Sequence, residues 1–395
     1  MKGDLVEVDV TAVAHGGHCV ARHEGRVVFV RHALPGERVV VRITEDTGGS
    51  YCRGDAVQVL QAAPERVEPP CPYAGPGRCG GCDFQHVTAA GQRDLKAAVV
   101  REQLSRLGGL PDVPVVVEEL PGGLLGWRTR MQFAVDRRGR AGLRRHRSHS
   151  VVPLADCPLA HPALSVSDVL ARRWRDAQGV EVVGSAAEPP TVLRRGLHRS
   201  VAVSGPQVRR EQAAGRSWQV DIGAFWQVHP AAADVLGAAV LSMLAPRPGE
   251  RCVDLYGGVG LFAGLLADTV GPTGSVLCVE GDRAAAADAR VNLAPTPWAS
   301  VRRQAVDAAL VAGLSAYDVA VLDPPRTGAG RPLVEALAAG PARAIAYVAC
   351  DPAALARDVK TFGEHGWRLA GLRAFDLFPM THHVECVALL EPDTR

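Results

Sequence analysis

A cysteine in the C-terminal part of the chain stands where reactive groups are often found. The apolar run 344–349 ends on Cys350, and Asp351 and Pro352 then form the cap and first residue of an expected helix. In an open parallel sheet, ligands bind at such carboxyl ends of strands, and a helix N-terminus favours the thiolate form of cysteine. The pattern predicts a nucleophilic Cys350, with a small buried cysteine at a strand end as the simpler alternative.

Acids and glycines follow the earlier strands of the same region, which alternates strands and helices like a doubly wound sheet. A turn with the spacing G-G-x-G spans 257–260, the next strand ends on Glu280, another ends near Asp307, and a fourth ends on Asp323. This spacing differs from the GxGxxG dinucleotide fingerprint and is common in class I S-adenosylmethionine (SAM) methyltransferases. Glu280 then stands where a ribose diol needs an acceptor, and Asp307 where a carboxylate could meet an adenine amino group. Each acid alone is more often a cap or turn residue.

A second group of cysteines lies in the first half of the chain. Cys79 and Cys82 are two residues apart between glycines, Cys71 precedes them, and Cys157 is the best candidate for a fourth ligand. This pattern suits one metal centre, either an iron–sulfur cluster or a structural zinc, and spacing does not choose between them. Unligated thiols are the remaining alternative.

Length and composition bound the class of protein. The 395 residues suggest two or three domains, and 47% apolar with 22% charged residues describe a globular protein. No apolar run reaches the roughly 18 residues that span a bilayer. The start of the chain has no apolar signal core, so we expect a cytoplasmic protein with reduced thiols and no membrane contact.

The net charge of +2 conceals two basic segments. Residues 127–147 hold eight arginines, Arg128 and Arg130 among them, against one acid, and residues 194–216 hold six against one. Such clusters suit a polyanion such as RNA. Arginine bias is the alternative, because the chain has only three lysines.

The N-terminal 61 residues alternate apolar and polar residues in four or five short segments, which predicts a small OB-like barrel. The run 16–21 and the segments at 28–30 and 33–37 resemble a TRAM domain, an RNA-binding module; a barrel acting only as a spacer is the alternative. Residues 92–107 read as an amphipathic helix, and 127–219 read as strand-like and loop-rich with no topology that we can draw.

Taken together, the motifs resemble the RNA 5-methyluridine (uracil-C5) methyltransferase family over nearly the whole chain. The motifs that carry the resemblance occur in the family's order: Phe225-Trp226-Gln227-Val228-His229-Pro230, Asp254-Leu255-Tyr256, Asp323-Pro324-Pro325-Arg326, Val348-Ala349-Cys350-Asp351-Pro352 and His382-His383-Val384-Glu385-Cys386. The resemblance implies a C-terminal Rossmann-like class I methyltransferase domain with an N-terminal OB-like TRAM barrel and a small iron–sulfur/β central domain. The implied ranges are 1–62 for the barrel, 63–87 with 115–218 for the central domain, and 88–114 with 219–395 for the catalytic domain.

The resemblance also implies roles for residues. Cys350 is the expected nucleophile, which adds to uracil C6 and so activates C5 toward the methyl group, and Glu385 is the expected base that removes the C5 proton. The expected cofactor-site residues are Gln227, Tyr256, Gly258, Gly260, Glu280, Asp307 and Asp323. The expected ligands of a [4Fe–4S] cluster are Cys71, Cys79, Cys82 and Cys157, and the expected substrate contacts are Phe225, Arg326, Arg128 and Arg130.

By the same resemblance we expect a monomer that acts on ribosomal RNA rather than on transfer RNA. A transfer-RNA uracil-C5 methyltransferase and a non-catalytic RNA-binding protein that keeps the cluster are the alternatives. The sequence departs from the family at three points: Leu261 replaces a frequent asparagine, Gly257 replaces a cysteine or serine, and the spacing from Cys71 to Cys79 is wider.

Overall fold

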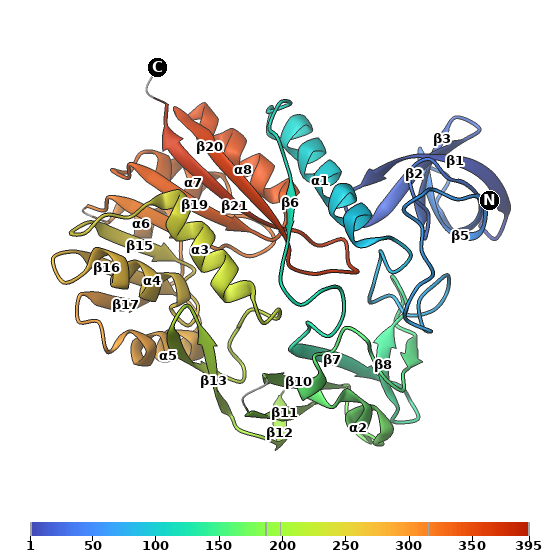
Figure 1. The fold of residues 1–395 in the computed structure, drawn as a ribbon, viewed down its shortest axis with the longest axis horizontal. Coiled ribbons are helices and arrows are strands. Elements are labelled where there is room, and N and C mark those ends of the chain that lie inside the picture. Colours follow the sequence, from blue (N-terminus) through green and yellow to red (C-terminus); the bar gives the residue numbers. More distant parts are fainter. Residues whose placement is uncertain (1, 186–187, 198, 315, 394–395) are drawn as a thin grey trace.

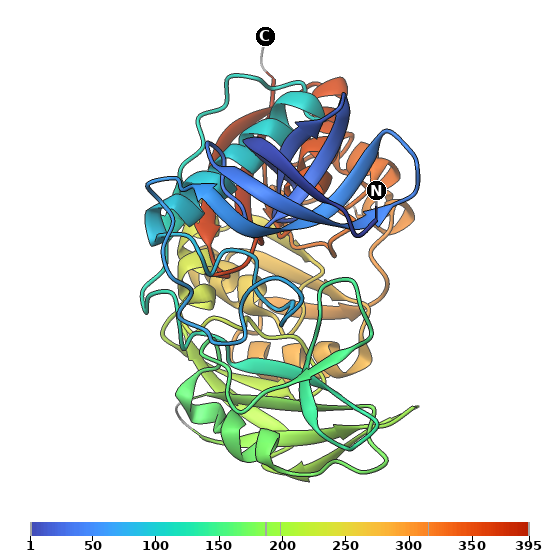
Figure 2. The same ribbon diagram turned by 90° about the vertical axis from the view of Figure 1, so that its right-hand side faces the viewer.

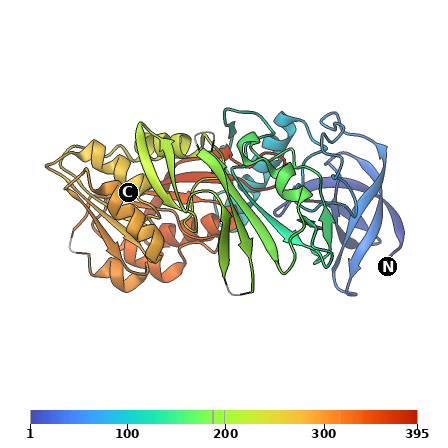
Figure 3. The same ribbon diagram turned by 90° about the horizontal axis from the view of Figure 1, so that it is seen from below.

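The computed structural model describes residues 2–185, 188–197, 199–314 and 316–393. Within these residues the strands form a closed barrel, a six-stranded sheet, a two-stranded ribbon and an eight-stranded sheet. Seen from below, the barrel and the eight-stranded sheet lie at opposite ends of the molecule, and the six-stranded sheet lies between them (Figure 3).

The N-terminal barrel confirms the expected OB-like fold. Its strands follow the order β1-β2-β3-β5-β4. Alternate valines point inward because side chains alternate along a strand, and Val6, Val8 and Val10 of β1 are all buried in the barrel core. The strands are β1 (Leu5–Ala14), β2 (His18–His23), β3 (Arg26–Arg31), β4 (Arg38–Asp46) and β5 (Tyr51–Gln61).

The middle of the chain forms the antiparallel six-stranded sheet, whose topology the sequence left open. Its order is β12-β11-β10-β7-β8-β9, and a short helix pair covers it. The strands are β7 (Arg130–Val135), β8 (Ala141–Arg144), β9 (Val151–Pro153), β10 (Gly179–Ser185), β11 (Glu188–Arg195) and β12 (Ser200–Ser204). The helices are η1 (Pro162–Leu164) and α2 (Val166–Ala171), and the ribbon β13 (Val208–Ala213) with β14 (Arg216–Asp221) follows.

The large sheet has the order β17-β16-β15-β18-β19-β21-β20-β6. Its first five strands are parallel, and β21 runs antiparallel between β19 and β20. Helices cover both faces, so the central strands are apolar throughout: every residue of β18 and β19 is buried. The strands are β6 (Val117–Glu119), β15 (Arg251–Leu255), β16 (Ser275–Glu280), β17 (Ala299–Arg303), β18 (Val319–Leu322), β19 (Ala344–Ala349), β20 (Trp367–Asp376) and β21 (Glu385–Pro392).

The helices of this part confirm the expected Rossmann-like arrangement. They are α3 (Ala232–Leu244), α4 (Leu261–Val270), α5 (Arg283–Leu293), α6 (Ala308–Ala312), α7 (Arg331–Ala338) and α8 (Pro352–Glu364). As the sequence predicts, Asp351 caps α8: its Oδ1 accepts a hydrogen bond from the Ala354 amide at 2.8 Å, and Pro352 is the first helical residue.

Helix α1 (Ala89–Arg106) connects the barrel to the large sheet. It begins three residues before the expected start at 92, after the cap Thr88. It packs against α8, β6 and β1, and it lies between barrel and sheet in Figure 1 and beside the barrel in Figure 2. The strand after it, β6, pairs with β20, so the chain leaves the large sheet only after Glu119. No helix in the described ranges is long and apolar enough to cross a membrane.

Candidate active site

The register of the large sheet brings the strand-end residues to one edge. Strand β15 pairs in parallel with β16 on one side and β18 on the other. Tyr256 directly follows β15, Glu280 ends β16 and Asp323 directly follows β18. The three side chains therefore stand at the carboxyl edge of the sheet, where doubly wound folds bind ligands.

Cys350 and Glu385 come from neighbouring antiparallel strands. Ala349, at the end of β19, lies opposite Cys386, near the start of β21. Cys350 follows the first of these residues and Glu385 precedes the second, so the two lie opposite each other across the strand pair. Cys350 is half-buried, whereas Glu385 is 4% exposed. The two residues that the sequence nominates for chemistry are thus neighbours.

Burial and neighbouring carboxylates raise the pKa values of the ionisable residues at this edge of the sheet. Burial and the carboxylate of Asp323 raise the pKa of Glu385 well above its usual value, against the opposing effect of Arg326. Burial raises the pKa of Asp323 to about 7. Burial, followed by the charges of Glu385 and Asp323, raises the pKa of the Cys350 thiol to about 11. The pKa of Cys350 is therefore raised, although a helix N-terminus by itself favours the thiolate.

The glycine turn after β15 is shaped to approach a ligand. Gly258 and Gly260 have φ of 55° and 92°, and a Cβ on Gly258 would meet nothing within 4 Å. The Gly258 amide donates to Glu280 Oε2 at 2.9 Å. Asp254 braces the turn through a bond from the Ala263 amide to its Oδ2 at 2.8 Å, while its buried Oδ1 has no partner among the residues that the structure describes. Open backbone, acids and an unpartnered polar oxygen suit a cofactor with a diol and an amino group.

Asp307 differs from the expectation. Strand β17 ends at Arg303, and Asp307 instead caps α6, where its Oδ1 accepts from the Leu310 amide at 2.7 Å. The carboxylate still raises the pKa of Tyr256, after burial and the carboxylate of Asp358, so it lies near the edge described above. The strand ends earlier than expected: the Gln304 amide still bonds to the Glu280 carbonyl at 3.1 Å, but Asp307 lies three residues further on and caps a helix instead.

The expected substrate contacts separate into exposed and bonded side chains. Phe225 is 62% exposed and Arg326 is exposed. Gln227, which was expected at the cofactor site, is buried. Arg130 donates to Glu181 at 2.6 Å and to the carbonyls of Ile222 and Ala224, so its guanidinium holds the six-stranded sheet to the turn before Phe225.

Arg128 is largely enclosed. Its Nε donates to the Arg130 carbonyl at 3.1 Å, and burial lowers the pKa of its guanidinium. The thiols of Cys82 and Cys157 oppose this lowering, which places Arg128 beside the cysteine group.

The four cysteines gather around the loop between barrel and α1. Burial raises the pKa of three of these thiols, to about 12 for Cys82 and about 11 for Cys157, and Cys71 and Cys79 both act on Cys157. Cys82 Sγ accepts from Gln85 Nε2 at 3.3 Å, and Cys79 Sγ accepts from the Gly81 amide at 3.4 Å. Nevertheless, no three metal-binding side chains in the described part of the chain meet in an arrangement that could hold a metal ion. The thiols are neighbours, but they are not arranged as ligands.

Three residues outside the expected site brace the loop before Glu385. Buried Lys96 of α1 donates to Asp376 at 2.5 Å, and Gln92 Oε1 accepts from the Met380 amide at 2.7 Å. Asp83, next to Cys82, accepts from the ring of His382 at 2.6 Å. The sequence signalled only the first of these contacts, through a lysine that lies inside an amphipathic helix.

The barrel also reaches this edge of the sheet. His15 Nε2 lies 3.2 Å from Asp351 Oδ2, one residue after Cys350. Gly17 packs so closely against His382 that an added Cβ would lie 2.8 Å from the His382 Cβ. The loop at 15–17 therefore forms part of the surroundings of Cys350, which no sequence pattern indicated.

Comparison with known proteins agrees with this architecture. Residues 1–57 match the model of the TRAM domain, and residues 310–393 match the tRNA (Uracil-5-)-methyltransferase model. The second match spans Asp323, Cys350 and Glu385, the acidic and thiol groups that meet at the sheet edge. A TRAM barrel joined to a class I methyltransferase fold defines the class of protein.

An uncharacterized RNA methyltransferase of Streptomyces avermitilis is 49% identical, and the match covers 100% of this chain and 99% of that protein. One of Bifidobacterium longum is 39% identical over 97% of this chain and 96% of that protein. The chain therefore belongs to this RNA methyltransferase family, with a TRAM domain and a uracil-5-methyltransferase segment.

A solved structure shares the whole fold. The Pyrococcus abyssi tRNA (uracil-54, C5)-methyltransferase, in complex with S-adenosyl-L-homocysteine, superposes with a TM-score of 0.73 at 22% identity. The match covers 97% of this chain and 99% of that chain, so barrel, middle sheet and catalytic sheet are all shared.

Proposed function

We propose that this protein methylates C5 of a uracil in RNA, with SAM as the methyl donor. The observation that carries the proposal is the placement of Cys350 opposite Glu385 at the sheet edge that also holds the glycine turn. A thiol and a carboxyl facing each other supply the nucleophile and the base that substitution at a pyrimidine C5 requires.

The residues of the turn fit SAM. SAM, when bound, supplies a methyl group carried on a positively charged sulfur. We infer that Glu280 accepts from the ribose hydroxyls, that Tyr256, Gly258 and Gly260 approach the amino-acid and sugar parts, and that Asp323 faces the sulfonium. Gln227 and Asp307 complete the proposed binding set, Gln227 because the family resemblance assigns it to the cofactor site and Asp307 because its charge reaches Tyr256.

The proposed reaction begins when the sulfur of Cys350 bonds to C6 of the uracil and C5 becomes nucleophilic. C5 takes the methyl group, and the bond from the methyl carbon to sulfur breaks. Glu385 then removes the proton that remains on C5, the C5–C6 double bond re-forms, and Cys350 leaves as the thiolate. A buried carboxyl with a raised pKa is a stronger base than an exposed one, which suits Glu385 to this proton transfer.

The thiol must lose its proton before it attacks. Burial and the charges of Glu385 and Asp323 raise the pKa of Cys350 to about 11, and the charge of Arg326 offsets this only in part. A cationic sulfonium beside these acids would lower that pKa. We therefore infer that a bound cofactor would favour the thiolate form of Cys350, with the thiol proton passing to water.

Substitution tests the two proposed roles. Cys350→Ala should abolish methyl transfer to RNA and keep SAM binding, measured by radiolabelled-methyl incorporation and by calorimetry. Glu385→Gln should accumulate a covalent protein–RNA adduct on denaturing gels, because the C5 proton stays in place. Undiminished turnover by Cys350→Ala would refute the mechanism.

For the substrate we propose ribosomal RNA, by analogy with family members that carry both a TRAM domain and cysteine ligands. Transfer RNA is the competing substrate, since the matching family model and the Pyrococcus abyssi protein are both named for it. Methyl incorporation into separately purified ribosomal and transfer RNA from a deletion strain would identify the substrate.

We also propose that Cys71, Cys79, Cys82 and Cys157 hold a [4Fe–4S] cluster, with zinc as the alternative. The mutual electrostatic effects of the thiols and the amide donors on two sulfurs support the proposal, and the side chains would have to turn toward one centre. Anaerobically purified protein should then be brown, with absorption near about 400 nm and acid-labile sulfide. A colourless preparation with stoichiometric zinc would select the alternative.

A further inference from the structure

A basic pocket opens in the six-stranded sheet and does not include the candidate catalytic residues. Its volume is about 930 Å³, at the upper end of the ~300–1,000 Å³ typical of ligand sites. Its lining contains no aspartate or glutamate, and neither Cys350 nor Glu385 belongs to it. Its arginines are Arg128, Arg144, Arg145, Arg147 and Arg195.

One wall of the pocket is formed by the end of β8 and the turn that follows it. Arg144 and Arg145 are exposed, and neither guanidinium has a carboxylate partner in the described ranges. His146 follows them, and its ring packs edge-on against the ring of His18 in the barrel, with 5.5 Å between the ring centroids.

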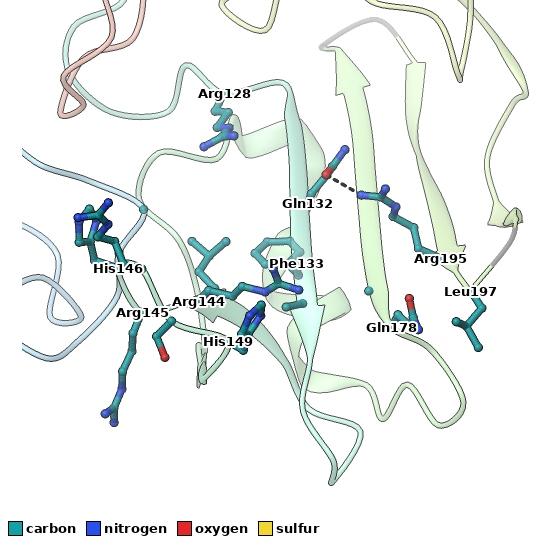
Figure 4. A pocket seen from close by; sticks show the side chains of 18 residues that line it. Arg128, Gln132, Phe133, Arg144, Arg145, His146, His149, Gln178, Arg195 and Leu197 are labelled. Atoms are coloured by element: carbon teal, nitrogen blue, oxygen red, sulfur yellow. Dashed lines mark hydrogen bonds between the residues drawn. The ribbon is translucent and has the colours of Figure 1, made fainter. Parts of the chain in front are cut away.

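The opposite wall carries amides. Arg195 of β11 reaches across to Gln132 of β7 and donates to its Oε1 at 2.6 Å, while Gln178 lines the same side (Figure 4). Figure 4 shows Gln132 and Arg195 pointing toward each other, while Arg144 and His149 lie on the other side of β7 in this view, near Phe133. The pocket thus has Arg144 and Arg145 on one side and, on the other, amide side chains together with the guanidinium of Arg195.

The loop between Cys79 and Cys82 closes the third side. The Gly80 amide donates to the Arg144 carbonyl at 2.9 Å, and a Cβ on Gly80 would lie 2.3 Å from the His146 nitrogen. The two segments are therefore packed backbone to backbone, which fixes the arginine wall in place.

We propose that this pocket binds an unpaired, single-stranded stretch of the RNA substrate, outside the nucleotide that reacts. Arg144 and Arg145 would pair with phosphates, and Gln132 and Gln178 would contact an unstacked base. Arginine forks match phosphate oxygens, and proteins read RNA sequence on unpaired bases because the deep groove of duplex RNA is closed to side chains. The inference rests on the proposed function only in taking RNA as the substrate.

The test measures RNA binding by the full-length protein without SAM. The probe is a fluorescein-labelled RNA of ~12 nucleotides, used as a single strand and as a duplex with its complement, at several salt concentrations. The variant Arg144→Ala with Arg145→Ala is compared with Arg137→Ala with Arg138→Ala. The control pair is exposed, lies on the turn between β7 and β8, changes the charge equally and does not line the pocket.

The pocket variant should bind the single strand at least about tenfold more weakly, and its log–log salt slope should fall by about 1.4, since each phosphate contact contributes about 0.7. The control should stay within about twofold, and duplex binding should change little. Equal weakening by both variants, or equal weakening of single strand and duplex, would overturn the proposal and indicate a general basic surface. The binding assay involves no methyl transfer. Its result can therefore be interpreted even if the proposed methylation of uracil proves wrong.

Discussion

The ring of His15, in the N-terminal barrel, lies 3.2 Å from the carboxylate of Asp351, the residue that follows Cys350. Asp351 also caps α8, so one carboxylate joins the barrel to the helix that begins behind the candidate nucleophile. The barrel therefore contributes to the shape of the candidate active site, beyond any role in holding RNA.

Removing this contact should impair turnover more than stability. Both side chains are partly exposed, so His15→Ala should cost less than about 1 kcal/mol of unfolding free energy. Because the contact positions the Cys350 loop, methyl transfer at saturating RNA should fall about tenfold or more. His23→Ala, in the same barrel, is the matched control; equal activity of the two variants would contradict the prediction.

The same pair predicts a pH dependence. Burial alone would raise the pKa of Asp351, but the bonds from His15 and from the amides of α8 outweigh it, and the pKa is lowered. A lowered carboxyl pKa contributes stability above the unfolded value of about 3.9 and loses it as the pH falls through the folded value. The parent and His15→Ala should thus differ in thermal midpoint at pH 6 and converge in strong acid.

The reactivity of Cys350 should report the charges around it. With a pKa of about 11, the thiol should react slowly with iodoacetamide at neutral pH, and its rate should rise until the pH passes that value. Glu385→Gln removes a charge that raises the pKa, so modification above neutral pH should become several-fold faster, whereas Arg326→Ala should slow it. Mass spectrometry of the Cys350 peptide gives the rates, and shifts of the same sign in both variants would refute this electrostatic account.

The buried pair of Lys96 and Asp376 should stabilise the position of α1 on the large sheet. Lys96→Met leaves a buried carboxylate without its partner, which should cost about 3–5 kcal/mol in urea unfolding. Replacing both residues, Lys96→Met with Asp376→Leu, should recover much of the loss. Arg106→Ala removes an exposed pair on the same helix and should cost under about 1 kcal/mol; a similar loss for both single variants would contradict the burial argument.

The side chain of Cys278 leaves no room for a Cβ at Gly257. A Cβ at this position would lie 2.4 Å from the Sγ of Cys278 and 3.1 Å from the Oδ2 of Asp254. Gly257→Ser should therefore displace the glycine turn and weaken SAM binding about tenfold or more in calorimetry. Adding Cys278→Ala removes the closest atom and should restore part of the affinity; no recovery would mean that the contact with Asp254 dominates.

Sequence alone determined the order of the parts and the residues worth testing. Valines at every second position predicted the barrel, and apolar runs that alternate with glycine and acidic turns predicted the catalytic sheet. Such local patterns show which face of each element is buried. The motifs around Asp323, Cys350 and Glu385 were visible for the same reason. The strand expected to end near Asp307 ends at Arg303, because a sequence does not show where backbone pairing with the neighbouring strand stops.

Tertiary structure decided everything that depends on distant segments meeting. The raised pKa of Cys350 comes from its burial and then from the charges of Glu385 and Asp323, and the contact of His15 with Asp351 joins parts of the chain more than three hundred residues apart. Arg130, a predicted RNA contact, donates hydrogen bonds to Glu181 and to two backbone carbonyls, which only the structure could show. Charge, burial and pairing are properties of neighbours in space, and a linear pattern does not contain them.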